Sequence, residues 1–99
     1  MLKKKFEDFI TLQRGFDLTR KEMRNGDIPV FGSTSIIGYH DLYKVLPPGV
    51  VTGRSGSLGK VQYTNQKFWP HNTSLWVKDF MGNHPKYVYY KLMTMKLEQ

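Results

Sequence analysis

A glycine-rich stretch with two cations is the first place where this chain could carry out chemistry. It runs VVTGRSGSLGKV from Val50 to Val61. A phosphate-binding P-loop needs four residues between its first glycine and a Gly-Lys pair, which Ser or Thr must follow. Here five residues separate Gly53 from Gly59, and Val61 follows Lys60. The spacing also departs from the dinucleotide-binding pattern, so a nucleotide loop is not predicted.

The same stretch predicts two strands joined by a turn. Residues 50–52 are β-branched, which favours a strand. Residues 60–64 alternate polar and apolar, as a half-buried strand does. The glycines between them permit the positive φ that a tight turn requires. The remaining question is what Arg54 and Lys60 contact.

The residues needed for catalysis or metal binding do not occur in suitable patterns. The three histidines, His40, His71 and His84, do not pair with one another or with an acid at metal-ligand spacing, and there is no cysteine. Ser55 sits in Gly-Arg-Ser-Gly, which is not the G-x-S-x-G order of a nucleophile elbow. We therefore expect no enzymatic activity, no cofactor and no metal.

Length and charge limit the class of protein further. With 99 residues, a single domain over residues 1–99 is expected. The net charge of +7 favours a polyanionic partner, usually nucleic acid, with simple solubility as the alternative. No apolar signal-peptide region and no apolar run of membrane-spanning length is present. The default expectation is a cytoplasmic protein without membrane contact.

Short strands are expected to hold these residues in place. Residues 6–12 fit a short helix or a strand edge equally well. Pro29 suits an edge strand, because proline cannot donate to a neighbouring strand. The strand candidates are residues 28–31, 36–40, 43–46, 50–52, 60–64 and 74–78.

The end of the chain predicts a helix. Asn83 is its expected N-cap, and Pro85 falls in the first turn, where proline is tolerated. An apolar stripe is expected to pack against the sheet, formed by Tyr87, Val88, Tyr90, Leu92, Met93 and Met95. The prediction is an α+β fold, in which a curved, mainly antiparallel sheet of short strands carries a C-terminal helix.

Four motifs in series resemble a known family. They are GDIPVFGSTSIIGYHD, LPPGVVTGRSGSLGKVQY, KFWPHNTSLWVKDF and HPKYVYYKL, in that order and closely spaced. Together they resemble the target-recognition domain of the DNA specificity subunit of type I restriction–modification systems. The resemblance covers most of the chain, from about Leu12 to Leu92.

The resemblance implies a function. Such subunits are not catalytic; each of two target-recognition domains reads one half of a split DNA site. The implied partners are double-stranded DNA, methyltransferase subunits and, through them, the endonuclease or motor subunit. A second specificity half is a further implied partner.

One departure from the family pattern concerns the long spacer helix. A helix from Pro85 to Glu98 would span roughly 20 Å at about 1.5 Å per residue. Half-sites one DNA turn apart need roughly 34 Å. The expectation is therefore a half-subunit or fragment that lacks the spacer helix. The alternative function is an interaction fragment that pairs with the methyltransferase or another half and binds DNA weakly.

On this resemblance, the densest basic region is the best candidate for DNA contact. It holds Arg14, Arg20, Lys21 and Arg24, with a solvated charged loop as the alternative. The hydroxyls of Ser33, Thr34 and Ser35 suit phosphate or base edges, or simply form a turn.

The remaining candidates are scattered along the chain. Arg54 and Ser55 resemble a phosphate-positioning element, with an ion pair from Arg54 to Asp41 or Asp79 as the alternative. Lys60 is expected either to contact a phosphate or to lie on a solvated face of its strand. His40 is a further candidate and is expected to point outward, while its neighbour Tyr39 is expected in the core. Asn72 lies in a packed corner at residues 69–73 and is a candidate reader of adenine.

Overall fold

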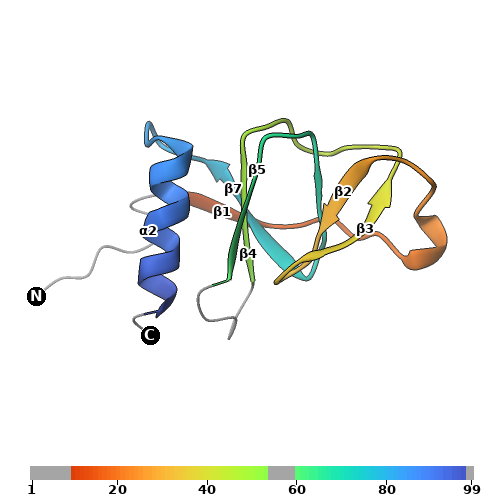
Figure 1. Cartoon of the computed structure of the whole chain (residues 1–99), viewed down its shortest axis with the longest axis horizontal. Helices are drawn as coiled ribbons and strands as arrows, with labels where there is room; N and C mark the ends of the chain where they lie inside the picture. The colour runs from red at the N-terminus through yellow and green to blue at the C-terminus, as the bar shows by residue number, and fades with distance from the viewer. Residues whose placement is uncertain (1–9, 54–59, 98–99) are drawn as a thin grey trace, which may run out of the picture.

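The computed structural model describes residues 10–53 and 60–97 of the chain. Figure 1 shows strands in the middle of the molecule and a long helix at one end. In chain order the elements are β1 (Thr11–Arg14), the short 3-10 helix η1 (Arg20–Glu22), β2 (Ile28–Phe31), β3 (Ile36–His40), β4 (Gly49–Gly53), β5 (Val61–Thr64), β6 (Trp69–Pro70), β7 (Ser74–Asp79) and α2 (Pro85–Leu97).

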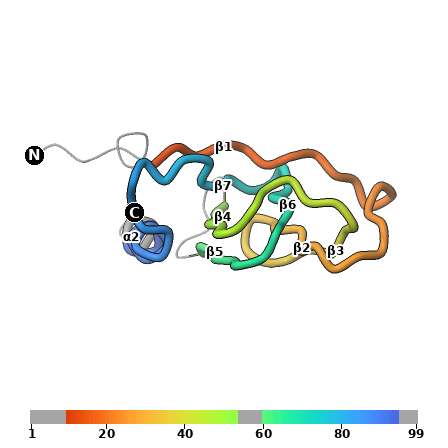
Figure 2. The backbone as a smooth tube through the Cα atoms, turned by 90° about the horizontal axis from the view of Figure 1, so that it is seen from above, coloured from red at the N-terminus to blue at the C-terminus, as the bar shows by residue number. Residues whose placement is uncertain are grey.

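The strands form two sheets, where a single sheet was expected. The larger sheet has the antiparallel order β1-β7-β4-β5, which Figure 2 shows from above. The smaller has the order β3-β2-β6, in which β2 is antiparallel to β3 and parallel to β6. The predicted α+β class, with short, mainly antiparallel strands and a C-terminal helix, is confirmed.

Strands β4 and β5 are the two arms of the predicted hairpin. They pair antiparallel, from Gly49 opposite Thr64 to Thr52 opposite Val61. A strand, and not the helix that a phosphate loop requires, therefore follows the glycine-rich stretch. The turn between the arms, with the predicted contact residues Arg54 and Ser55, lies outside the described residues.

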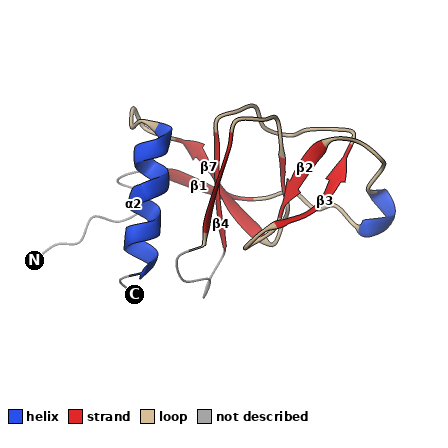
Figure 3. Ribbon diagram, in the orientation of Figure 1, coloured by secondary structure: helices blue, strands red, loops and turns tan. Residues whose placement is uncertain are grey.

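The large sheet is the middle of three layers. Successive side chains of a strand face opposite sides of its sheet. On β4, Val50 packs in the cluster that contains α2, while Val51 packs with Phe31 of the small sheet and with Phe68. Both faces of β4 are therefore covered, and Figure 3 shows the succession of helix, large sheet and small sheet.

Helix α2 buries one narrow face. Val88 and Leu92, four residues apart and so on the same face, are fully buried. Tyr87 and Tyr90 are exposed, so the predicted apolar stripe was wrong for these two tyrosines. Over residues 10–53 and 60–97, no helix is long and apolar enough to span a membrane.

Helix α2 begins at Pro85, and His84 directly precedes it. The amide of Val88 donates to the carbonyl of His84 at 3.0 Å, and the amide of Lys86 donates to Nδ1 of the same residue at 3.2 Å. His84 therefore satisfies the open amide of Lys86 in the first turn. The Asn83 side chain donates backwards to the Phe80 carbonyl.

Two strand expectations were also wrong. β2 is the central strand of the small sheet although it contains Pro29. Its pairing with β6 starts only at Val30, so the missing N–H of the proline falls outside that pairing. Residues 43–46 form no strand, and Val45 makes only an isolated bridge to Phe68.

The packing of α2 on the large sheet gives a first prediction. Leu92→Ala should lower the free energy of unfolding by about 2–5 kcal/mol, because it removes buried methyl groups and leaves a cavity. Leu46 is 58% exposed, so Leu46→Ala should cost less than about 0.5 kcal/mol. Urea unfolding of both variants checks this, and equal losses would contradict the packing described.

Candidate nucleic-acid interface

Two stretches of chain pass side by side from one sheet to the other. One runs from Arg14, the last residue of β1, to Leu18, and the other runs from Pro70, the last residue of β6, to Ser74, the first residue of β7. The amide of Gly15 donates to the carbonyl of Ser74 at 3.0 Å, and that of Phe16 donates to the carbonyl of Pro70 at 2.8 Å. We call this pair of stretches the crossing.

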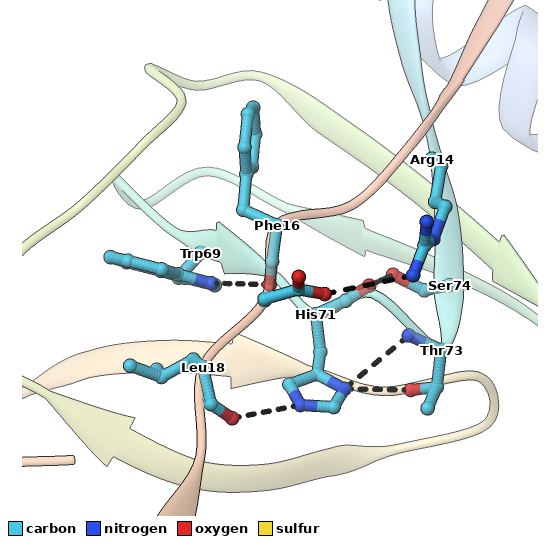
Figure 4. Close-up of polar contacts among 8 residues, drawn as sticks. Arg14, Phe16, Leu18, Trp69, His71, Thr73 and Ser74 are labelled. Atoms are coloured by element: carbon cyan, nitrogen blue, oxygen red, sulfur yellow. Dashed lines mark hydrogen bonds and ion pairs between the residues drawn. The ribbon is translucent and has the colours of Figure 1, made fainter. Parts of the chain in front are cut away.

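The crossing is also tied by side chains, as Figure 4 shows. Trp69 Nε1–H donates to the carbonyl of Phe16 at 3.0 Å. The Nδ1 atom of His71 accepts the amide of Thr73, which places the ring proton on Nε2. Nε2 then donates to the carbonyl of Leu18 at 3.0 Å. The residues on both sides of the crossing are therefore held at fixed positions.

The crossing requires glycine at position 15. A Cβ atom there would overlap the backbone carbonyl groups of Pro70 and His71. The absence of a side chain thus lets the two stretches approach closely enough to hydrogen bond.

A hollow of about 670 Å³ opens beside the crossing. Its lining includes Arg14 and Arg20 from the first stretch and the turn after it, and His71 and Asn72 from the second. We call it the basic hollow. Three of the predicted contact residues, Arg14, Arg20 and Asn72, therefore line one surface although more than fifty positions separate Arg20 from Asn72.

A second, smaller hollow of about 390 Å³ lies nearby. Lys21 and Arg24, the other two cations of the predicted basic region, line it. Asp17 and Leu18 line both hollows, so the two share a wall. The predicted basic region is thus distributed over two adjoining concave surfaces. The short helix η1, which carries Arg20 and Lys21, lies at the end of the molecule opposite α2 (Figure 1).

A capping box shapes the segment that carries these cations. The amide of Thr19 donates to Glu22 Oε1 at 2.9 Å, and the amide of Glu22 donates to Thr19 Oγ1 at 3.3 Å. The backbone hydrogen bond from Thr19 holds the pKa of the Glu22 carboxyl below its usual value. The Thr-x-x-Glu spacing is a sequence signal for this turn that our sequence analysis missed.

An ion pair anchors the end of the segment. Arg24 Nε lies 2.8 Å from Asp41 Oδ2. The hydrogen bond from Arg24 lowers the pKa of the Asp41 carboxyl, and the same contact raises the pKa of Arg24. Asp41 is therefore engaged by Arg24, although it was proposed from the sequence as an alternative partner of Arg54.

The expected orientation of Tyr39 and His40 is reversed. Tyr39 is 52% exposed, while His40 is buried with 2% of its surface accessible. His40 Nδ1 accepts the amide of Arg24 at 3.0 Å, and its ring meets Trp69 edge to face. His40 lines the second hollow but is almost wholly buried, and its ring accepts the backbone amide of Arg24.

Other predicted residues do not line either hollow. Ser33 is half-buried, while Thr34 and Ser35 are exposed at the tip of the β2–β3 hairpin. The hairpin tip is closed by a 2.8 Å bond from the amide of Gly32 to the carbonyl of Ser35. Lys60 is exposed just before β5, and its carbonyl accepts from Thr52.

The structure also reveals a cation that the sequence did not single out. Lys44 Nζ lies 5.0 Å from the ring centre of Trp69 and 5.2 Å from that of Phe16. Such positions are attractive because the ring faces carry negative charge. No sequence spacing signals this contact, since the three residues come from distant parts of the chain. Among the described residues, no three or more histidines or acids are grouped to hold a metal.

Comparison with known proteins supports the fold. No protein-family model and no curated protein sequence matches this chain. Among solved structures, it is similar to the type I restriction-modification system S subunit from M. genitalium, with a TM-score of 0.65 and 15% identity. The match covers 90% of this chain and 26% of that chain. The chain therefore shares a fold with about a quarter of that S subunit.

Acid should loosen the segment that carries the cations. The folded pKa of Asp41 is depressed, so the stability from its pair with Arg24 is present above the carboxyl's ordinary pKa of 3.8 and is lost as pH falls through the lowered value. Asp41→Asn should lower stability at pH 7 and flatten its decline below about pH 4.

Thermal unfolding between pH 7 and pH 3 measures this effect. Asp27→Asn is the matched control, because Asp27 is exposed and lines neither hollow. It should keep the acid-dependent decline that Asp41→Asn reduces. Identical pH profiles for wild type and Asp41→Asn would contradict a stabilising role for the Arg24 pair.

The close approach at Gly15 gives a third prediction. Gly15→Ala should cost about 3 kcal/mol or more, because the new methyl group meets backbone atoms that cannot move away. In Gly38→Ala the methyl group meets only the flexible end of Met23, so the cost should stay below about 1 kcal/mol. Urea unfolding compares the two, and similar costs would contradict the tight crossing.

Proposed function

We propose that this chain is a DNA-recognition domain of a type I restriction–modification specificity protein. In this role it is not an enzyme; it binds double-stranded DNA and reads one half of a bipartite site. The observation that carries the proposal is the basic hollow, which gathers Arg14, Arg20 and Asn72 in a chain of net charge +7. The fold shared with an S subunit supports the same family.

The chemistry of the two hollows suits a duplex. Arginine and lysine neutralise phosphates, which supplies most of the sequence-independent affinity. Asn72 offers an amide, the group that pairs with the N6 and N7 atoms of adenine. Arg24 is held by Asp41 and by the backbone bond to His40, so its position is set before DNA arrives.

The opposite end of the molecule suits a protein partner. Tyr87 and Tyr90 are exposed on α2, and Figure 3 shows this helix far from η1, the turn that carries Arg20 and Lys21. A duplex held at the hollows would leave the helix uncovered. We propose methyltransferase subunits as partners, with an endonuclease or motor subunit recruited through them, a second specificity half as a further partner, and the cytoplasm as the location.

A second candidate function is an interaction fragment with little DNA binding of its own. The observation that favours it is a series of exposed apolar side chains between positions 36 and 46, namely Ile36, Ile37, Tyr39, Leu42, Tyr43 and Leu46. Exposed apolar surface of this kind marks protein contacts. Co-purification with methyltransferase subunits in the absence of DNA binding would favour this candidate.

Selection from a randomised duplex pool at two salt concentrations tests the proposed function. Contact with about five phosphates should give a slope of log K against log salt near −4 to −5. Lys21→Ala, at the second hollow, should reduce the slope by about 1 and weaken binding to all sequences alike. Lys91→Ala, an exposed lysine on α2, is the matched control and should change neither.

The outcomes separate the two candidates. An enriched motif of a few base pairs, with the slope change in Lys21→Ala alone, would support the DNA-recognition domain. No binding at low salt would overturn it and favour the interaction fragment. An equal loss in both lysine variants would show that DNA is held by overall charge and not at the hollows.

A further inference from the structure

One acidic residue lies within the basic surface. Asp17 lines both hollows, and its side chain is 81% exposed. Arg14, Arg20 and Asn72 share the larger hollow with it. A carboxylate repels phosphate, so a surface that bound only the DNA backbone would be weakened by Asp17. Its presence there points to a ligand group that donates hydrogen bonds.

Stabilisation of the fold does not account for Asp17. Its Oδ1 atom lies 3.6 Å from an Arg14 guanidinium nitrogen, and the Arg14 side chain is itself 56% exposed. An exposed pair with this separation contributes little to stability. The Arg24–Asp41 pair, at 2.8 Å, shows the closer geometry of a pair that anchors the backbone.

The chemistry of base edges fits this arrangement. In the major groove, a G·C pair presents the acceptors O6 and N7 on guanine and the N4 amino donor on cytosine. Arginine supplies two donors for guanine, and aspartate accepts from the cytosine amino group. Arg14 and Asp17 are adjacent on the hollow wall. Arg14 can therefore donate to the two guanine acceptors while Asp17 accepts from the cytosine amino group, either of the same G·C pair or of a neighbouring pair.

We propose that Asp17 is a specificity-determining residue that accepts a hydrogen bond from the N4 amino group of cytosine, while Arg14 contacts guanine. This inference rests on the proposed DNA-recognition function and deepens it by naming the base that the hollow selects. In the absence of DNA, the carboxylate is paired loosely with Arg14, at 3.6 Å. Binding to a G·C pair gives both groups base partners.

Duplex selection with the whole chain and its variants tests the inference. Wild type should enrich a motif that contains a G·C pair at a defined position. Asp17→Ala should lower the preference for cytosine at that position by about tenfold, while its affinity for unrelated duplexes stays equal or rises because a negative charge is removed. Asp17→Asn should shift the preference toward adenine, because an amide both donates and accepts.

Two controls and one further variant make the outcomes decisive. Asp27→Asn carries the same charge change outside both hollows and should enrich the wild-type motif. Urea unfolding should show equal stability for Asp17→Ala and wild type, as expected for an exposed side chain. Arg14→Ala should lose the guanine preference at the same or the adjacent position.

The failure of the inference differs from the failure of the proposed function. If wild type enriches a motif and Asp17→Ala enriches the same one, or if the wild-type motif has no fixed G·C pair, the inference is overturned and DNA recognition stands. If wild type binds without enriching any motif, or does not bind, both are overturned.

Discussion

The rest of the structure depends on the hydrogen bonds of the crossing. The amides of Gly15 and Phe16 reach carbonyls of the 70–74 stretch, and the amide of His71 reaches the carbonyl of Phe31 in β2. Each buried amide needs such a partner, because an unpaired one is costly. These bonds set the small sheet against the large one, and the basic hollow opens beside the place where they are made. The position of the surface proposed to bind DNA is thus set by the way in which the two sheets are joined.

Acidic residues in this basic chain serve separate purposes. Glu22 closes the capping box with Thr19, and Asp41 holds Arg24. Both position the backbone that carries cations, so they strengthen the basic surface although they reduce its net charge. Asp17 differs because its contact with Arg14 is long and exposed. Geometry therefore separates acids that support the surface from the one that we propose to take part in recognition.

Local patterns in the sequence predicted the parts of the fold that depend on neighbouring residues. The arms of the β4–β5 hairpin, the start of α2 near Pro85 and the burial of Val88 and Leu92 follow from alternation, proline preference and helical spacing.

The sequence could not predict the reversed orientation of Tyr39 and His40. That orientation is decided by the amide of Arg24 and the ring of Trp69, which lie far away in the chain. Arg14 and Asn72 line one hollow for the same kind of reason, because hydrogen bonds between distant stretches of chain hold the two sides of the crossing together. The capping box of Thr19 and Glu22 was visible as a local motif and was overlooked.

The basic hollow is assembled from separate segments, with lining residues near positions 14–23, at 37 and at 71–72. An unfolded chain does not bring these segments together, so a ligand that needs all of them binds only the folded state. Binding and folding are then thermodynamically linked: ligand at a hundred times its Kd adds about 2.7 kcal/mol to the free energy of unfolding. For a domain of this size, that gain shifts the melting temperature by roughly 10–20 °C. The target duplex would thus protect the domain from proteolysis, and the pool of folded chains would rise wherever its site is present.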